Sequence, residues 1–410
     1  MLAFGIAVPL ALLAVFGPAA ARDLDDAVRW IVRDDTINTL IGAVFCAVVS
    51  TLALRRVRHY PGAAVPRFIL PIFALSFGTL LAVITLLRLD YSNRLLIAFF
   101  VGMLAARFAL TAMRSRSKGL LYALVPGGRA GVINEVLGTN VFTLEKPALE
   151  GLVDCAIIAD LHADLPAEWE RFLAEAAISG RPVFHYKQVW EAETGKVQID
   201  HMSENSLGAL VPSLAYQKIK RTIDLLFSLV ALPIVLPIMF VCAIFIKAEG
   251  GGAVFFRQRR LGFRGKEFHV LKFRTMTEGN DGADRDLSIT QAGDKRITKC
   301  GQFLRRTRLD ELPQIVNVIK GEMSWIGPRP EAISLAEWYD QEIPFYQYRH
   351  IVRPGITGWS QVNQGHVTDI GAVHEKLQYD FYYVKNLSYW LDIIIALRTV
   401  RVMVSGHGAK

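Results

Sequence analysis

The chain has 410 residues, of which 52% are hydrophobic and 20% are charged, and its mean hydropathy is +0.30. This length allows two or three domains, and the high hydropathy argues against a purely water-soluble protein. The net charge of +8 suits anionic lipids or phosphorylated substrates. Because the hydropathy indicates a membrane, we expect no nucleic acid among the partners.

The first predicted elements are four apolar runs, at about 2–20, 36–54, 68–87 and 95–113. Each has close to the ~20 residues that a membrane-spanning helix needs. Small residues follow the first run, as in a cleaved signal peptide, but no basic segment precedes it and three further runs follow. We therefore predict a retained helix and a four-helix transmembrane domain over residues 1–115.

The segments that connect these runs differ in charge. RRVRHYPGAAVPR, between the second and third runs, and MRSRSK, after the fourth, are basic, whereas RDLDDAVRWIVRDD after the first is rich in acids. Basic connections tend to remain on the cytoplasmic side of a membrane. We therefore expect both ends of the helical block to face the cytoplasm, so that the rest of the chain begins there.

Residues 116–210 have the pattern of a small α/β domain. Buried strands are predicted at LYALV, LVDCAIIADL and RPVFHY, and an amphipathic helix at AEWERFLAEAAISG. The glycines after the first strand, Gly127, Gly128 and Gly131, do not fit the G-x-G-x-x-G spacing of a dinucleotide site. We prefer a structural or regulatory Rossmann-like module to a nucleotide-binding one.

The run LLFSLVALPIVLPIMFVCAIFI, residues 225–246, is long enough to cross a bilayer but contains Pro233 and Pro237. Its Leu, Ile, Val and Phe side chains favour insertion by roughly 5–9 kcal/mol, whereas each interior proline costs a helix ~3 kcal/mol. Both flanks are basic, Lys218 among them, and so favour the cytoplasm. We predict a re-entrant hairpin at 222–247 that enters the membrane and returns to the same face; a kinked spanning helix is the alternative.

A charge-rich segment follows, with four informative clusters. They are FRQRRLGFRGKEFHVLKFRTM (256–276), RRTRLDELPQIVNVIKG (305–321), WIGPRPE (325–331) and VRPGITGWSQV (352–362). The first predicts a half-buried strand, the second a basic turn before two acids and a short amphipathic helix, and the last two stiff Pro/Gly loops. Arginines held in such loops make a receptor for phosphate oxygens, because a guanidinium presents a planar fork of donors.

Asp310 and Glu311 are the adjacent acids of the second cluster. A bare pyrophosphate would repel them, so a divalent cation is expected between acids and phosphates, with Mg²⁺ the hard, oxygen-binding choice. A carboxylate can also attack phosphorus. Neighbours on a helix point ~100° apart, so one acid could attack while the other holds the metal. Arg305, Arg306 and Arg308 should keep both acids ionised.

Each cluster also has a purely structural interpretation. Asp310 could be a helix N-cap, because Pro313 fits an early helix position. The arginines could pair with lipid headgroups or surface acids, and GPRP could be merely a turn. Together, and directly after an element that enters the membrane, the clusters favour phosphoryl chemistry on a lipid.

At these residues the sequence resembles the bacterial sugar transferase family, the monotopic phosphoglycosyl transferases. The resemblance covers about 215–405. It rests on KRTIDLLFSLV, the proline hairpin, FRQRRLG, LKFRTM, RLDELPQIVNVIKGEMSWIGPRP, VRPGITGWSQVNQG and YDFYYVKNLSYWLDIIIALRTV. The four-helix block and the small α/β domain resemble the extensions that longer members carry before the catalytic part.

The resemblance implies transfer of a hexose 1-phosphate from a UDP-sugar to undecaprenyl phosphate, with release of UMP and a covalent aspartyl-phosphosugar intermediate. It implies Asp310 as the nucleophile and Glu311 as the Mg²⁺ ligand. The phosphate-binding residues that it implies are Lys272, Arg305, Arg329 and Arg353. Lys218, Arg221 and Asp224 match the entry to the re-entrant helix. Pro237 matches its break point, where a Ser-Pro pair is frequent, but Leu236 precedes it here.

The resemblance also implies a location and a pathway. The catalytic part would lie on the cytoplasmic face of the bacterial inner membrane, among its lipids, as a monomer or a homo-oligomer, and would initiate exopolysaccharide, capsule or O-antigen synthesis. Residues 211–410 would then be a mostly helical α/β domain with a re-entrant helix and interfacial amphipathic helices. The segment LSYWLDIIIALRTVRVMV fits such an interfacial helix, or else a buried core helix.

Two other functions stay open at this point. A non-enzymatic membrane scaffold, or a chain-length regulator of polysaccharide export, would need neither Asp310 nor Glu311. A glycosyltransferase that uses the lipid without a covalent intermediate would keep part of its activity without a nucleophile. Loss of the Asp310 carboxylate distinguishes all three.

Overall fold

The computed structural model describes residues 33–57, 65–115, 121–150, 152, 155–198, 212–250, 252–277, 294, 296–365 and 370–405. The chain divides into two compact units, Met1–Gly195 and Lys196–Lys410. The first apolar run lies outside the described residues. The division into 1–115, 116–210 and 211–410 stays a prediction.

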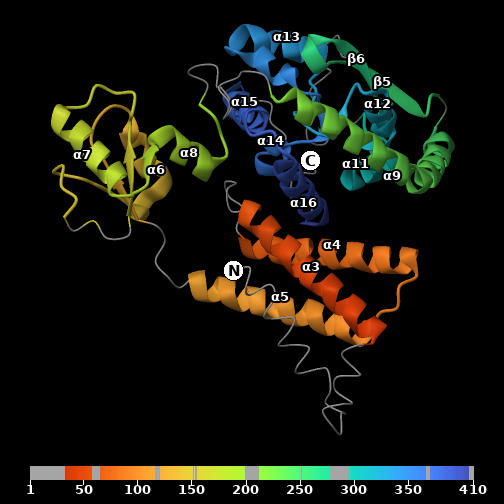
Figure 1. Cartoon of the computed structure of the whole chain (residues 1–410). Helices are drawn as coiled ribbons and strands as arrows, with labels where there is room; N and C mark the ends of the chain where they lie inside the picture. The colour runs from red at the N-terminus through yellow and green to blue at the C-terminus, as the bar shows by residue number, and fades with distance from the viewer. Residues whose placement is uncertain are drawn as a thin grey trace. The chain divides into compact units, whose positions relative to one another are not determined.

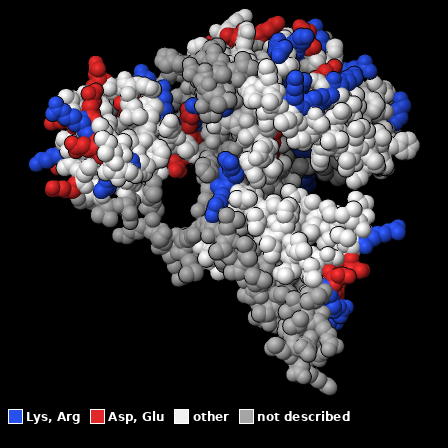
Figure 2. Space-filling view, viewed as in Figure 1, with Lys and Arg blue, Asp and Glu red and all other residues white. Residues whose placement is uncertain are grey.

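The first unit begins, within the described residues, with three long helices that lie against one another (Figure 1). They are α3 (Asp34–Val57), α4 (Val65–Leu87) and α5 (Asn93–Ser115). These helices confirm the last three predicted runs, and each is long and apolar enough to cross a membrane. A hydroxyl contact joins two of them, because Ser50 Oγ lies 3.0 Å from Ser76 Oγ. The face of this block that Figure 2 shows carries few charged side chains, as a lipid-facing surface would.

A small parallel sheet follows in the same unit, with the strand order β2-β1-β3-β4 in the described chain. Its strands are β1 (Leu121–Leu124), β2 (Val141–Thr143), β3 (Cys155–Ala159) and β4 (Val183–His185). Alternate side chains of β3 pack on opposite faces: Ile157 packs beside α7 (Ala167–Ile178), and Ile158 beside α6 (Ile133–Leu137) and α8 (Tyr186–Thr194). The three predicted strands and the predicted helix α7 are confirmed, whereas β2, α6 and α8 were not predicted.

The second unit is mostly helical, with an antiparallel hairpin of β5 (Phe255–Leu261) and β6 (Glu267–Phe273). A second, parallel pair joins β7 (Ser324–Ile326) to β8 (Gly355–Thr357). The helices are α9 (Leu214–Glu249), α11 (Lys299–Thr307), α12 (Ile315–Lys320), α13 (Ile333–Glu342), α14 (Trp359–Asn363), α15 (Ile370–Lys385) and α16 (Tyr389–Ser405), with 3₁₀ turns η3 (Phe263–Gly265), η4 (Leu309–Gln314) and η5 (Tyr346–Ile351). The predicted strand at 256–276 is therefore a hairpin. Lys and Arg side chains gather over it on the face seen in Figure 2.

The helix α16 corresponds to the segment expected either at the membrane interface or in the core. Leu391, Ile394 and Ile395 are fully buried, whereas Val400 and Met403 are more than half exposed. One face of α16 is therefore a core face. The exposed apolar residues near its end leave the interfacial role as a prediction.

The long helix α9 contains both prolines and is helical throughout. No non-helical segment interrupts α9, because the helical backbone continues across Pro233 and Pro237. In this respect the predicted break is wrong. Its buried residues, Asp224, Ser228, Val235, Cys242 and Ile246, recur every four or seven positions and so form one face. The other faces expose large apolar side chains, among them Val230, Ile234 and Phe240. A return of α9 to the same membrane face stays a prediction.

The N-terminal half of α9 is fixed by polar contacts. Arg221 donates from Nη2 to the carbonyl of Ile319 at 2.6 Å and from Nη1 to that of Val318. It therefore caps the C-terminus of α12, where a cation also complements the helix dipole. Ser228 accepts a hydrogen bond of 2.9 Å from the indole N–H of Trp325, a residue of β7.

The C-terminal half of α9 packs on different elements of the same unit. Cys242 and Ile246 join a core cluster with Phe273 of β6 and Leu304 of α11. The Glu249 carboxylate accepts a hydrogen bond of 3.0 Å from the backbone N–H of Cys300. Both halves of α9 are consequently bound to one compact unit.

Two predicted Pro/Gly loops are joined by the β7–β8 pair. The Gly327 N–H donates to the Thr357 carbonyl at 2.9 Å, and the Gly355 N–H donates to the Pro328 carbonyl at 2.9 Å. A Cβ atom on Gly355 would lie 2.1 Å from the backbone nitrogen of Gly327. The close approach of the two backbones therefore requires glycine.

Gly355→Ala is expected to destabilise the second unit by about 1–3 kcal/mol or more, because overpacking forces the two backbones apart. The matched control is Gly250→Ala, where nothing lies within 4 Å of the added Cβ. The measurement is the thermal unfolding midpoint of the purified protein. Equal midpoints for the two variants would show that the contact between the loops does not hold them together.

Candidate active site

The acid pair lies in η4, directly after a sharp reversal of the chain. Arg308 has a left-handed backbone with φ of 59°, ends α11 and precedes η4. The change of direction places Asp310 and Glu311 inward, at 9% and 7% relative exposure. Successive side chains of a 3₁₀ turn point ~120° apart, so the two carboxylates face different surroundings.

Two sequence interpretations of this cluster are wrong. Arg305 and Arg306 lie in the last turn of α11 rather than in a basic turn. Asp310 is not an N-cap, because η4 begins before it and its Oδ1 accepts no hydrogen bond among the described residues.

Glu311 is held by three cations from three parts of the unit. Its Oε1 lies 2.7 Å from Nη2 of Arg329, 3.8 Å from Nη1 of Arg308 and 4.0 Å from Nζ of Lys272. Burial alone would raise the pKa of Glu311, but the charges of Arg329 and Lys272 lower it to about 2. Glu311 is therefore ionised and fixed in place.

Asp310 behaves in the opposite way. Burial, followed by the charge of Glu311, raises its pKa, although Lys272 and Arg308 oppose the shift. The prediction that nearby cations keep both acids ionised is thus supported for Glu311, whereas the shift of Asp310 runs in the other direction. A buried carboxylate oxygen without a partner is costly. Asp310 is consequently the group of this site that would gain most from an arriving cation or electrophile.

Lys272 extends from β6 beside both acids. Burial and the charges of Arg260 and Arg329 lower its pKa to about 7, although Glu311 and Asp310 attract the proton. An ammonium that loses its proton so readily lacks enough negative charge around it. A bound phosphate would supply that charge and restore the proton.

The other predicted phosphate ligands are divided between two places. Arg329 lies in the site, against Glu311. Arg305 donates from Nε to Thr275 Oγ1 at 2.9 Å and interacts electrostatically with Asp310. Arg353 lies elsewhere: its Nε donates to the Gly321 carbonyl at 3.0 Å, and its guanidinium covers the Phe263 ring.

Two of the predicted entry residues of α9, Arg221 and Asp224, are neighbours of Arg353. The charged neighbours of Arg353 are Arg221, Asp224 and Arg264. Asp224 is buried at 4% exposure and accepts a hydrogen bond of 3.4 Å from the Trp325 N–H, whereas Lys218 is exposed. These contacts place Arg221, Asp224 and Arg353 at the base of α9. They give Arg353 a structural role there, and its charged neighbours in the described part of the chain do not include either acid of the pair.

Sequence reasoning missed a residue that positions Arg329. Arg349, 3% exposed, donates from Nη2 to the Arg329 carbonyl at 2.7 Å and lies 2.8 Å from Asp380. Arg260 likewise donates to the Pro330 carbonyl. These two guanidiniums therefore hold the backbone of the GPRP loop, residues 327–330, through its carbonyl groups. The available signal was an arginine in YQYRHIVRPG, close before a Pro/Gly loop.

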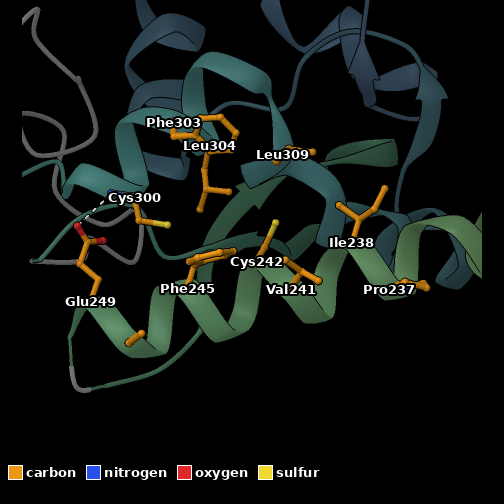
Figure 3. Close-up of a pocket in the computed structure, with 11 residues that line it drawn as sticks. Pro237, Ile238, Val241, Cys242, Phe245, Glu249, Cys300, Phe303, Leu304 and Leu309 are labelled. Atoms are coloured by element: carbon orange, nitrogen blue, oxygen red, sulfur yellow. Dashed lines mark hydrogen bonds between the residues drawn. The ribbon is translucent and has the colours of Figure 1, made fainter.

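An apolar groove of about 850 Å³ lies between α9 and the α11–η4 segment (Figure 3). Val241, Cys242 and Phe245 project from α9 toward Phe303 and Leu304 on the opposite side. The remaining lining residues are Pro237, Ile238, Ala248, Glu249, Cys300 and Leu309. Leu309, which directly precedes Asp310, lines the groove, whereas neither acid of the pair is among its lining residues.

Comparison with known proteins gives the site a context. The model of the bacterial sugar transferase family matches residues 215–406. The UDP-N-acetylgalactosamine-undecaprenyl-phosphate N-acetylgalactosaminephosphotransferase of Aeromonas hydrophila is 40% identical over 407 residues, 98% of this chain and 94% of that protein. UDP-glucose:undecaprenyl-phosphate glucose-1-phosphate transferases are 45% identical over 183 residues in Xanthomonas campestris pv. campestris and 41% identical over 186 residues in Escherichia coli (strain K12). Each of these two matches covers 44% of this chain, and 38% and 39% of the respective relative.

The charge balance of the site predicts an unusual titration of Lys272. The rate of its acetylation by acetic anhydride should have a midpoint near pH 7, because only the neutral amine reacts and its pKa is lowered to about 7. Glu311→Gln removes a charge that favours the proton, so the midpoint should move to lower pH. Exposed Glu337 on α13 provides the control Glu337→Gln, which should leave it unchanged. The midpoint is measured by mass spectrometry of the peptide that contains Lys272. A midpoint near the ordinary lysine value of ~10.4 would show that the site does not lower the pKa of Lys272.

Proposed function

The chain belongs to the bacterial sugar transferase family, and we propose on that premise that it transfers a hexose 1-phosphate from a UDP-sugar to undecaprenyl phosphate and releases UMP. The observation that carries the proposal is the buried Asp310 with the cations Lys272, Arg308 and Arg329 around it, and with the residue before it, Leu309, lining an apolar groove. One substrate of this reaction is a water-soluble diphosphate and the other is a phosphorylated lipid. The two environments that they need meet at Asp310.

The donor diphosphate would bind to Lys272 and Arg329. The negative charge of the phosphate would stabilise the protonated ammonium of Lys272. Arg329 has further N–H donors besides the one that bonds to Glu311. Glu311 would hold Mg²⁺. The two carboxylates of the site, Asp310 and Glu311, offer the hard oxygen donors that this ion prefers, and Oδ1 of Asp310 has no hydrogen-bond partner among the described residues. When bound, Mg²⁺ supplies charge neutralisation to the diphosphate.

Asp310 would act as the nucleophile of the first step. Its carboxylate oxygen forms a bond to the phosphorus that carries the sugar, the bond from that phosphorus to the bridging oxygen breaks, and the electron pair leaves with UMP. The raised pKa of Asp310 makes its carboxylate the more basic of the two acids. Glu311, with a pKa near 2 and an ion pair to Arg329, is fixed for binding rather than attack.

The lipid acceptor would complete the reaction. The part of its hydrocarbon chain nearest the phosphate would lie in the apolar groove between α9 and α11, with the phosphate toward Leu309 and Asp310. A phosphate oxygen of the lipid attacks the same phosphorus and displaces the Asp310 carboxylate. This step restores the enzyme and leaves the sugar on a lipid diphosphate, the first product of exopolysaccharide, capsule or O-antigen assembly.

The re-entrant path of α9 is supported by its contacts. Contacts to α12 and β7 hold its N-terminal half, and contacts to β6 and α11 hold its C-terminal half. A straight helix of this length is ~54 Å long, well above the ~30 Å of a bilayer core. If α9 crossed the membrane, parts of one charged unit would have to lie on both sides of it. We therefore place both ends of α9, and the catalytic unit, at the cytoplasmic face of the inner membrane.

Asp310→Asn keeps the shape of the side chain but removes the nucleophile, so UMP release should fall by at least ~10³-fold. Release is measured in membranes supplied with undecaprenyl phosphate and, separately, UDP-N-acetylgalactosamine or UDP-glucose. Glu337→Gln should retain activity, and unchanged unfolding midpoints should show that both variants fold. A scaffold protein would show no Asp310-dependent release. A transferase without a covalent intermediate would keep a substantial fraction of it.

The position of α9 is tested by single cysteines in a chain without native cysteines. Ala215→Cys lies near the start of α9 and Gly250→Cys directly after its end; both positions are exposed. In intact cells a membrane-impermeant maleimide should label neither, and permeabilisation should make both reactive. Labelling of one position from outside would mean that α9 crosses the membrane and would exclude the re-entrant path.

A further inference from the structure

The parallel-sheet module, residues 121–195, brings together three side chains that the transfer reaction does not use. Asp160 follows β3, His162 lies two residues further, and His185 ends β4. One ligand atom from each lies within 4.8 Å of the others. The group sits at the carboxyl ends of the strands, where open α/β sheets bind their ligands.

An anionic ligand does not fit this place. Asp160 Oδ2 accepts a hydrogen bond of 2.9 Å from the N–H of Arg129, and Oδ1 accepts one of 3.2 Å from the N–H of His162. A Cβ atom on Gly128 would lie 2.5 Å from Oδ2. The carboxylate thus occupies the glycine loop where a phosphate would need the N–H groups. Its charge would also repel a phosphate, so the ligand class that matches is a cation.

His185 contributes a nitrogen that lacks a partner. The residue is 9% exposed, and its Nε2 is buried with no hydrogen-bond partner in the described part of the chain. Its Nδ1 lies 3.3 Å from the Ala159 carbonyl oxygen and 3.9 Å from Asp160 Oδ1. Histidines that bind metal commonly give their other ring N–H to a backbone carbonyl. Nδ1 thus has two backbone neighbours at 3.3 Å, the Ala159 carbonyl oxygen and the Leu161 N–H. In the tautomer in which Nδ1–H donates to Ala159, Nε2 keeps a lone pair for a metal ion.

The side chain of His162 is the one of the three that can move toward the other two. It is exposed, and its ring centroid lies 4.6 Å from that of His185 in an edge-to-face arrangement. Zinc ligands lie ~2.0–2.2 Å from the ion, so the donors must approach one another more closely than they do here. The exposed His162 side chain can make that approach, while backbone contacts hold Asp160 and His185.

We propose that Asp160, His162 and His185 form a binding site for a divalent transition-metal ion, with Zn²⁺ the best match. Two imidazoles and one carboxylate are a donor set of zinc-type sites. Mg²⁺ prefers oxygen ligands alone, so this site is chemically separate from the acid pair at 310–311. The ion would join the loops that follow β3 and β4, and would stabilise the sheet end that carries the Gly128 loop.

The test uses the full chain in detergent, stripped with a chelator and then equilibrated with Co²⁺ or Zn²⁺. We expect one tightly bound ion per chain by elemental analysis, and visible Co²⁺ absorption bands typical of a site of low coordination number. His162→Ala should weaken binding at least ~10-fold, because even loss of a group behind a metal ligand costs 10–100-fold. His374→Ala, at an exposed histidine of α15, is the matched control and should bind like the wild type.

A second measurement separates a built site from scattered surface binding. Zn²⁺ should raise the unfolding midpoint of the wild type and of His374→Ala, but not that of His162→Ala, whose exposed side chain can be removed without opening the core. Equal Zn²⁺ affinity of His162→Ala and the wild type, or the absence of Co²⁺ bands, would overturn the proposal. UMP release at the Asp310 site is measured separately, so failure of one proposal leaves the other standing.

Discussion

The ion pair between Glu311 and Arg329 is the interaction on which the candidate site depends. It joins η4 to the GPRP loop, and its 2.7 Å contact helps keep a buried acid charged. Removing either partner would leave an uncompensated buried charge, which is strongly destabilising in proteins. Burial is the largest cause of the raised pKa of Asp310 and of the lowered pKa of Lys272; the Glu311 charge adds to the first shift, and the Arg260 and Arg329 charges add to the second. The site therefore holds a carboxylate that is more basic than usual and an ammonium that is more acidic than usual.

Contacts of the GPRP loop and of η4 with neighbouring elements hold Arg329 and Glu311 in place. Arg349 holds the backbone of Arg329 from one side, and the glycine contact of β7 with β8 holds the same loop from the other. The left-handed Arg308 turns the chain so that both acids of η4 point inward. The helix α9 contributes an apolar wall to the groove that Leu309 also lines. In the proposed reaction, the water-soluble diphosphate would approach Asp310 from the side of Lys272 and Arg329, and the lipid phosphate from the groove.

Much of this arrangement was predictable from sequence, for identifiable reasons. Long apolar runs gave α3, α4 and α5, and alternating or continuous apolar patterns gave β1, β3 and β4, because these signals are local. The acid pair and Arg329 were predictable from residue type and stiff flanking residues. Short elements such as β2 and α8 carry too few residues for a clear period. The location of Arg353, the role of Arg349 and the opposite pKa shifts of the two acids depend on burial and on partners distant in sequence. The helix α9 continues across both prolines because tertiary contacts on each side offset the local cost.

The most direct test of the account is the covalent state of Asp310. Wild-type protein is mixed with the UDP-sugar it uses and no lipid acceptor, quenched with acid, digested and analysed by mass spectrometry. The account predicts a burst of UMP no larger than the amount of enzyme, and a sugar phosphate on the peptide that contains Asp310. Adding undecaprenyl phosphate before the quench should remove that modification. An unmodified peptide from a preparation that completes the reaction when the lipid is present would contradict the central claim.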